Sequence, residues 1–379
     1  MVFYQLYNYF NKNNDIFDSY QNILEFIPTI KLKIKEQNII ESQYNIIQTI
    51  SSFCKSINQN KFIISLSGGI DSMVLITILH WLDYNVVACH INYNNRPETT
   101  QEQKFIEEWC YYNNIKLYVK SIDEIKRNNT KRSDYEIITK NIRLDFYKEI
   151  MQKENTNYIL LGHHKDDIIE NIVANICRGR NILDLAVIKK ISIINNINIG
   201  RPMIDYYKST IYQFAHNYQV PYFKDSTPSW SVRGKYRNEI YPAIESAFTT
   251  NVKENLISLS IQSNEWNLII NQKIITPFMD QLEWGTNEDN KIYVKFNIEK
   301  YIDYPLSFWS VVFMNIFTKN GYNCPSKKGI QTFLNTIKKR SSVSYGTKYN
   351  VTLSNTCICT VKNSVNSNSI KVNILFKNI

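Results

Sequence analysis

The stretch Ser65-Leu66-Ser67-Gly68-Gly69-Ile70-Asp71-Ser72 decides the fold, because it joins an apparent buried strand to an apparent buried helix. The apolar run 62–64 before it is typical of a strand, and Met73–Leu79 after it is typical of a buried helix face. Glycines let the backbone approach a phosphate closely, and free N–H groups at a helix start point toward such an anion. Two serine hydroxyls can add donors, and the Asp71 carboxylate can hold Mg²⁺. The stretch therefore predicts a phosphate site.

A serine-capped turn without a ligand would explain the glycine pair alone. It explains less well the whole string between a strand and a helix. No Gly-Lys-Ser/Thr follows the glycines, so the loop is not of the Walker type. We therefore favour a phosphate-binding loop of another kind.

Composition indicates a globular protein of two or three domains, with 379 residues of which 44% are hydrophobic. The formal net charge of +10 favours a polyanionic partner, RNA first, although an AT-rich genome also produces Lys-rich chains. The 7 Cys residues form no C-x-x-C pair, which argues against a zinc ribbon or an iron–sulfur framework. Cysteines that are scattered and odd in number favour a reducing compartment, where disulfides are rare.

We expect neither a signal peptide nor a membrane span in this sequence. The start, 1–7, lacks the basic region and long apolar core of a signal peptide, and no run approaches the ~20 apolar residues of a membrane span. We expect a cytoplasmic protein, with an organelle or the cytosol of a virus-infected host cell as alternatives. The sequence indicates no protein partner.

Apolar runs alternate with helical patterns from residue 61 onward, which predicts an α/β fold with a parallel sheet and helices on both faces. We expect a helical N-terminal extension over 1–60, a catalytic domain over 61–248 and a small, mainly helical or mixed C-terminal domain over 249–379. The tail of that last domain, Val343–Phe376, alternates as short antiparallel strands do. The strands expected in the catalytic domain are 62–66, 86–91, 116–119 and 158–161, with a fifth apolar stretch at 193–199.

A second string, Gly162-His163-His164-Lys165-Asp166-Asp167-Ile168-Ile169-Glu170, follows the strand that ends at Leu161. Asp167 and Glu170 are three residues apart, so they share one face of the first helical turn. Acidic residues at a helix start are common for dipole reasons alone, and loop histidines often have backbone partners. The complete pattern at a strand end instead favours a site: His163 can balance phosphate charge, and the carboxylates can hold Mg²⁺ or take a proton from an amine.

The two strings together resemble the PP-loop N-type ATP pyrophosphatases, and within them the tRNA(Ile)-lysidine synthase family, over roughly residues 61–245. Tyr93, Phe146 and Tyr241 depart from the family pattern at positions linked to nucleotide or tRNA contacts. Further strings that resemble the family are Cys177-Arg178-Gly179, Arg201-Pro202-Met203, Asp225-Ser226-Thr227-Pro228, Tyr236-Arg237-Asn238, and His90-Ile91-Asn92 followed by Arg96.

The resemblance implies an adenine nucleotide alpha hydrolase-like fold and a ligase that forms a carbon–nitrogen bond. ATP with Mg²⁺ would adenylylate the C2 oxygen of the wobble cytidine in an isoleucine tRNA with a CAU anticodon. Free L-lysine would then attack C2 through its ε-amine, which must be neutral, and lysidine, AMP and pyrophosphate would result.

The resemblance also implies residue roles. Catalytic roles fall to Asp71, His163, Asp167, Glu170, Arg143 and Arg237; cofactor binding to Ser67, Gly68, Gly69, Ile70, Asp71, Ser72 and His90; and metal binding to Asp71 and Asp167. A surface ion pair is the alternative for either arginine. The basic helix end Lys338-Lys339-Arg340 is a candidate tRNA contact or an ordinary solvated helix end.

Two rival functions remain open at this point. A tRNA thiolation enzyme also adenylylates a base, but such enzymes use paired or catalytic cysteines, for which only Cys177 is well placed in the sequence. An RNA-binding protein with a decayed ATP site would explain the altered RNA-side motifs but not the two intact strings. Amidotransferase-type synthetases share the loop and need a glutamine-hydrolysing domain, which nothing in the sequence indicates.

Overall fold

The computed structural model describes residues 41–95, 99–123, 125, 130–185, 188–223, 227, 229–248, 251–341, 348–363 and 370–377. The chain divides into two compact units, one formed by Met1–Gly179 with Leu185–Ser260 and the other by Arg180–Asp184 with Ile261–Ile379. Several predictions lie outside the described residues, namely those for 1–40, Arg96, 224–226 and Pro228, and the side chain of Arg340.

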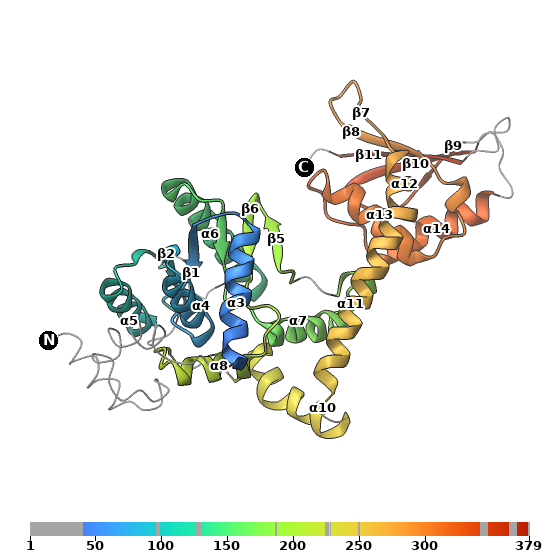
Figure 1. The fold of residues 1–379 in the computed structure, drawn as a ribbon. Coiled ribbons are helices and arrows are strands. Elements are labelled where there is room, and N and C mark those ends of the chain that lie inside the picture. The colour runs from blue at the N-terminus through green and yellow to red at the C-terminus, as the bar shows by residue number, and fades with distance from the viewer. Residues whose placement is uncertain are drawn as a thin grey trace. The chain divides into compact units, whose positions relative to one another are not determined.

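The first unit is built on a six-stranded sheet in the order β3-β2-β1-β4-β6-β5, of which Figure 1 labels β1, β2, β5 and β6. All neighbouring pairs are parallel except β5 with β6. The predicted parallel α/β sheet is therefore confirmed. The strands are β1 (Lys61–Ser65), β2 (Asn85–Asn92), β3 (Lys116–Ser121), β4 (Tyr158–Leu160), β5 (Ile191–Ile194) and β6 (Ile197–Gly200).

Helices cover both faces of this sheet. Alternate side chains of β1 point to opposite faces and therefore enter two different hydrophobic clusters. Phe62 and Ile64 pack with buried residues of α3 (Glu41–Ser56), α4 (Ile70–Trp81), α5 (Thr99–Tyr112) and α8 (Lys208–Asn217). Ile63 between them packs against α6 (Arg132–Glu154) on the other face.

Helix α3 lies in the segment that we expected to be an N-terminal extension. Its residues Ile46, Ile50 and Phe53 are spaced four and three apart, so they share one helix face, and all three are buried in the first cluster. The described part of the expected extension is therefore integral to the core of the sheet.

The apolar stretch 193–199 forms the ends of two strands and the turn between them. Asn195 and Asn196 have φ of 49° and 64°, which is the left-handed geometry of a two-residue hairpin turn. Strands β5 and β6 are consequently antiparallel, and only β6 adds to the parallel part of the sheet.

Short helical segments complete the first unit. Helix α7 (Lys165–Cys177) follows β4. After α8 come α9 (Val232–Lys235), the π-helix η3 (Tyr236–Ile240), α10 (Tyr241–Phe248) and the first part of α11 (Val252–Ile270). A π turn aligns residues five apart, and such turns are frequent at functional sites.

The second unit contains a five-stranded antiparallel sheet and several helices. Its core is aromatic, with Trp309, Phe313 and Phe333 fully buried. The antiparallel strands predicted for the tail are present as β9 to β11, whereas the β7–β8 hairpin was not predicted. The elements are β7 (Glu283–Thr286), β8 (Ile292–Asn297), β9 (Lys348–Val351), β10 (Cys357–Asn363), β11 (Ile370–Phe376), η2 (Ile182–Asp184), η4 (Asn271–Ile275), α12 (Thr276–Asp280), η5 (Glu299–Tyr301), α13 (Leu306–Thr318) and α14 (Lys327–Ser341).

Candidate active site

The loop between β1 and α4 is closed by its own serines. The Ser67 backbone N–H donates to Ser72 Oγ over 3.2 Å, and Ser72 Oγ donates to the Gly69 carbonyl over 3.0 Å. Gly68 has a φ of 82°, a conformation that residues other than glycine rarely adopt. The loop is thus held in shape at the start of α4, where the free N–H groups of a helix attract anions.

A second glycine turn, at Gly162 after β4, lies directly against this loop. A Cβ atom on Gly162 would come within 2.9 Å of the Asp71 backbone carbon and 3.0 Å of the Ser72 nitrogen. Only glycine permits that approach. The two predicted strings therefore meet at neighbouring carboxyl ends of β1 and β4, as parallel sheets place their ligand sites.

The N-terminus of helix α7 is capped by one of its own acidic residues, Asp167. The His164 backbone N–H donates to Asp167 Oδ2 over 3.1 Å, which caps the helix. Asp167 and Glu170 are both buried, on the face that the spacing predicted. Burial would raise the pKa of Asp167, but His164, His163 and Arg233 lower it on balance.

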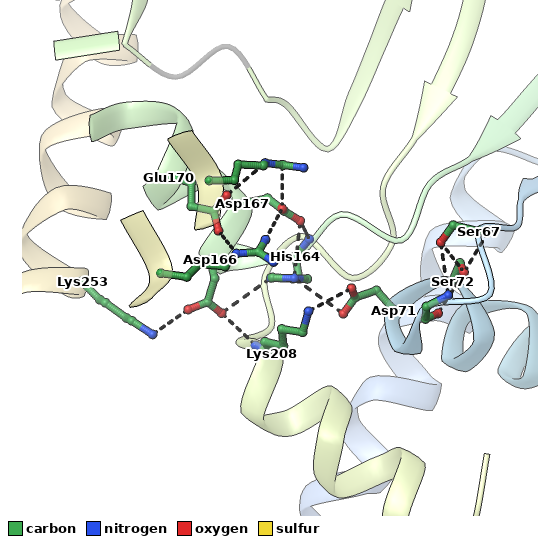
Figure 2. A network of polar contacts seen from close by, with 12 residues as sticks. Ser67, Asp71, Ser72, His164, Asp166, Asp167, Glu170, Lys208 and Lys253 are labelled. Carbon is green, nitrogen blue, oxygen red and sulfur yellow. Dashed lines mark hydrogen bonds and ion pairs between the residues drawn. The ribbon is translucent and has the colours of Figure 1, made fainter. Parts of the chain in front are cut away.

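His164 occupies the centre of a charged network (Figure 2). Its Nε2 lies 3.6 Å from Asp71 Oδ1 and 3.5 Å from Asp167 Oδ2, and its Nδ1 lies 3.6 Å from Asp166 Oδ2. Burial alone would lower the pKa of His164, yet the three carboxylates raise it on balance. His164 is therefore held toward its cationic form.

Two lysines also belong to the network: Lys208 lies between Asp71 and Asp166, and Lys253 lies at one end beside Asp166 (Figure 2). Lys208 Nζ lies 3.5 Å from Asp71 Oδ2, and Lys253 Nζ donates to Asp166 Oδ1 over 2.6 Å. The Lys208 backbone N–H, at the start of α8, donates to Asp166 Oδ2 over 2.8 Å. Asp166, on α7, is thus hydrogen-bonded to both α8 and α11.

Two arginines, from α9 and η3, bind the buried carboxylates of α7. Arg233 Nη2 donates to Asp167 Oδ1 over 3.1 Å, and its Nε lies 3.1 Å from Glu170 Oε2. Arg237 Nε donates to Glu170 Oε1, and its Nη2 lies 3.9 Å from Asp167 Oδ1. The Arg233 side chain is 56% exposed and that of Arg237 26%, so solvent or a ligand can reach both guanidinium groups.

Arg201 fixes the tautomer of His163 and helps to lower its pKa. Its Nε donates to His163 Nδ1 over 3.0 Å, and its Nη1 donates to the Lys189 carbonyl and to Ser192 Oγ over 2.6 and 2.9 Å. Because a guanidinium has no lone pair to accept with, Nδ1 must be unprotonated and the ring proton must lie on Nε2. Burial, aided by Arg201 and Arg233, lowers the pKa of His163 to about 4.

A cavity of about 460 Å³, here called the outer cavity, collects most of the predicted site residues. Arg143, which is exposed on α6, also lines it. A second cavity of about 150 Å³, the inner cavity, is lined by Glu170. Arg237 and Lys208 line both cavities. The predicted residues that line the outer cavity are Ser67, Gly69, Ile70, Asp71, Ser72, Arg143, His163, Asp167 and Arg237.

His90 is a predicted ligand-binding residue that the structure keeps away from both cavities. It is 4% exposed, and its Nδ1 donates to the Leu66 carbonyl over 2.8 Å. Burial lowers the pKa of its ring. In this arrangement His90 holds the backbone at Leu66, at the start of the loop, through a hydrogen bond.

Four basic residues of the site, Lys208, Arg201, Arg233 and Lys253, had no role in the sequence prediction. Arg201 begins the string Arg201-Pro202-Met203, which resembles the family. Arg233 lies four residues before Arg237, one helical turn away. That spacing was a usable signal for a second guanidinium on the same face. Lys208 and Lys253 become partners of the aspartates only through tertiary contacts.

Asp71 and Asp167 are the two carboxylates predicted to bind Mg²⁺. No group of three or more His, Cys, Asp or Glu side chains among the described residues is arranged to hold a metal ion. Asp71 Oδ1 is nevertheless buried with no hydrogen-bond partner in the described part of the chain, and burial raises the pKa of Asp71. One such carboxylate beside phosphate oxygens fits Mg²⁺, which commonly takes one or two carboxylates and substrate phosphates. Asp167 fits less well, because both its oxygens already accept hydrogen bonds.

Comparison with known proteins identifies the class of this site. The family model described as PP-loop domain matches residues 42–244, which include both strings and nearly all of α3. The chain belongs to this family.

Its curated relatives are similar over part of their length. A tRNA(Ile)-lysidine synthase of Mycoplasmopsis pulmonis is 33% identical over 47% of this chain and 61% of its own. One of Bacteroides thetaiotaomicron is 26% identical over 62% of this chain and 56% of its own. The chain thus spans little more than half the length of these relatives. Among solved structures, a U34-tRNA thiolase of Methanococcus maripaludis has a TM-score of 0.45 and 16% identity over 60% of this chain and 80% of its own.

Proposed function

We propose that this protein is an ATP-dependent tRNA-modifying ligase that forms lysidine in an isoleucine tRNA with a CAU anticodon. One observation carries the proposal: the glycine loop, His163 and the Asp167 carboxylate line the same cavity. Curated relatives named tRNA(Ile)-lysidine synthase support the choice of reaction. The net charge of +10 supports an RNA substrate.

ATP would bind with its phosphates at the glycine loop. The start of α4 offers backbone N–H groups to the phosphates. His163, held neutral with its proton on Nε2, would donate one hydrogen bond without adding charge. Lys208, which also lines this cavity, would offset the negative charge of the pyrophosphate as it leaves.

The first chemical step would be transfer of AMP to the RNA. The C2 oxygen of the wobble cytidine attacks the α-phosphorus, the bond between the α-phosphorus and the bridging oxygen breaks, and pyrophosphate leaves. The C2 oxygen then departs readily in the next step, because it leaves as AMP. Arg143 and Arg237 line this cavity and would contact the RNA or the developing charge.

The second step would be attack of the neutral ε-amine of lysine on C2, with loss of AMP and of one proton from the amine. Asp167 lines the outer cavity and Glu170 lines the inner cavity, and one of these carboxylates would take the proton. The arginine contacts that now neutralise both carboxylates would yield to the incoming amine.

Mg²⁺, when bound, would stabilise negative charge on the phosphates. Asp71 is the residue that would hold it, through the buried Oδ1 that no described residue hydrogen-bonds. The His164 and Lys208 contacts would keep the Asp71 carboxylate in place.

A tRNA thiolation reaction is the second candidate, and the cysteines give it little support. Cys177 is exposed at the end of α7 and lines neither cavity. The cysteines that the structure describes form no disulfide, and burial raises the pKa of the Cys54, Cys89 and Cys110 thiols. Raised thiol pKa values oppose the reactive thiolate form.

The test is incorporation of labelled lysine into a CAU-anticodon isoleucine tRNA transcript, with ATP and Mg²⁺. We expect label in the RNA with the wild-type protein and none with Asp71→Asn. A transcript with a CAU anticodon in the methionine tRNA body serves as the RNA control. Label transfer from a sulfur donor instead of lysine would favour thiolation, and binding of RNA without any label would favour a decayed ATP site.

A further inference from the structure

The positive charge of the chain is gathered in its last part. Residues 304–379 contain 10 Lys and Arg residues and no Asp or Glu, whereas residues 1–303 contain basic and acidic residues in equal number. The formal net charge of +10 therefore lies entirely in this stretch, which belongs to the second unit. One sign of charge gathered on one compact unit favours a surface that binds a polyanion.

The five-stranded sheet of the second unit has one covered face and one exposed face. Val361 and Val372, which are opposite each other on β10 and β11, are buried in the cluster that contains the apolar residues of α13 and α14. Their chain neighbours Lys362 and Lys371 are exposed. Because successive side chains of a strand point to opposite faces, these lysines lie on the face that the two helices do not cover.

Three lysines lie in one row across this exposed face. Lys362 on β10 is directly opposite both Lys371 on β11 and Lys348 on β9. Neighbouring strands are about 4.8 Å apart, so this lysine row spans roughly 10 Å. All three side chains are exposed, and none forms an ion pair or a hydrogen bond with another described residue. Like charges directly opposite each other destabilise a sheet, so the row is unfavourable unless an anion covers it.

The residues around the lysine row suit a phosphate backbone. Amide and hydroxyl side chains donate to phosphate and sugar oxygens, as lysines do. The row continues on β8 with Asn297, opposite Lys371. Glu283 is the only acidic side chain described in the neighbouring row, and it lies on β7, the strand farthest from β9. From β7 to β9 this neighbouring row consists of Glu283, Lys295, Asn373, Thr360 and Asn350.

The basic end of α14 is a weaker candidate for the same role. Lys338 Nζ lies 3.4 Å from Asp303 Oδ1, so part of the charge at this helix end is already neutralised within the unit. Ile330 and Phe333 of α14 are buried in the same cluster as Val361, which places this helix on the covered face of the sheet. The lysine row and the end of α14 therefore belong to different faces.

We propose that the lysine row binds the phosphate backbone of the RNA substrate. The inference rests on the proposed function for the identity of the RNA, and it goes beyond that function by assigning an RNA-binding surface to one face of the second unit. Lysine side chains act on phosphates as flexible point charges, and phosphate contacts carry no sequence information. The row thus supplies affinity for RNA, while the choice of anticodon is left to other residues.

The experiment compares two triple variants of the full chain, each of which removes three positive charges from the second unit. The row variant carries Lys348→Gln, Lys362→Gln and Lys371→Gln. The control variant carries Lys273→Gln, Lys300→Gln and Lys327→Gln, at three exposed lysines outside the row. Dissociation constants are measured at several salt concentrations for the CAU-anticodon isoleucine transcript and for the methionine tRNA control.

We expect the row variant to bind both transcripts at least about tenfold more weakly at low salt. The slope of log K against log salt should fall by about 2 to 3, since each phosphate contact contributes about 0.7–0.9. The control variant should change this slope by less than about 1. The melting temperature of the row variant should stay the same or rise, because repulsion between neighbouring strands is removed. Weaker binding would then not result from unfolding.

An unchanged slope in the row variant, or an equal fall in both variants, would overturn the inference. Loss of binding to phosphatidylserine vesicles with unchanged RNA binding would also overturn it, by assigning the row to a lipid surface. RNA binding with the expected slopes but without lysine transfer would support this inference and contradict the proposed function. Absence of RNA binding by the wild-type protein would overturn both.

Discussion

Arg201 Nε donates a hydrogen bond to His163 Nδ1 over 3.0 Å, and this contact places the only proton of a neutral imidazole on Nε2. Arg201 is itself 5% exposed and held by β5 through Ser192. A histidine in this state can donate to a phosphate and cannot accept from one. Strand β5, whose antiparallel direction was not predicted, therefore supports His163, which was predicted as a site residue.

His163 should make the stability of the protein depend on pH between about 4 and its ordinary value of 6.5. The folded state lowers the pKa of His163 to about 4, so between these values the unfolded chain binds the extra proton. The free energy of unfolding should thus fall as the pH falls through this window and level off below it. His163→Asn should reduce this fall, since its Oδ1 can accept from Arg201 without titrating. Urea unfolding of both proteins at several pH values across the window measures the difference. Identical slopes would contradict the assignment.

Asp71→Asn should abolish activity without weakening the fold. Burial raises the pKa of Asp71 above its ordinary value, so the ionised form of this carboxylate opposes folding. The amide keeps the shape and removes that charge. We expect an unchanged or higher melting temperature at neutral pH, together with at least about a hundredfold loss of AMP formation. A melting temperature lowered by several degrees would indicate that the Lys208 and His164 contacts outweigh the burial of the charge.

Glycine substitutions should separate ligand approach from internal packing. Gly162→Ala places a Cβ 2.9 Å from the Asp71 backbone carbon and should cost about 1–3 kcal/mol of stability, as overpacking does. Gly69→Ala meets Ser67 Oγ at 3.5 Å, an ordinary contact, and should leave stability within about 0.5 kcal/mol. Its methyl group would instead obstruct phosphate, so the KM for ATP should rise. Denaturant titration with ATP kinetics distinguishes the two, and equal stability losses would contradict this geometry.

The arginine contacts on the buried carboxylates should be worth more than an exposed ion pair. Arg233→Met removes contacts to Asp167 and Glu170, whose side chains are 8% exposed, and should cost about 1–3 kcal/mol. The control is Lys190→Met, which breaks a 2.9 Å pair with Asp205, where both side chains are well exposed, and should cost under about 1 kcal/mol. Chemical denaturation measures both variants. A cost for Arg233→Met no larger than the control would mean that Arg237 alone neutralises the carboxylates.

The parallel sheet and the two strings at its strand ends were predictable from the sequence because their signals are local. Each strand of the parallel sheet is a short apolar run, and each run is followed by a helical pattern, so order and orientation follow from chain alternation. The two strings lie at strand ends, which placed Asp71 and Asp167 together before any contact was known. Asn195-Asn196 was also a local signal, since two residues with positive φ join β5 and β6.

The missed features depend on contacts between residues distant in sequence. Nothing near Lys208 or Lys253 indicates that they neutralise Asp71 and Asp166, because those partners are 137 and 87 residues away. His90 was expected near the nucleotide because it stands in a string that resembles the family, and its ring is buried and hydrogen-bonded to the Leu66 carbonyl. The β7–β8 hairpin was missed because Glu283–Thr286 is short and weakly apolar.

No helix within the described ranges is long and apolar enough to cross a bilayer.

The most direct measurement is the product balance of ATP cleavage by the wild-type protein with CAU-anticodon isoleucine tRNA and labelled lysine. The proposed site joins the α-phosphate of ATP to RNA and then exchanges AMP for lysine. We therefore expect AMP, pyrophosphate and lysine-labelled RNA in equal amounts, and none of them without the tRNA. Formation of ADP and phosphate, or of AMP and pyrophosphate with no lysine in the RNA, would contradict the account.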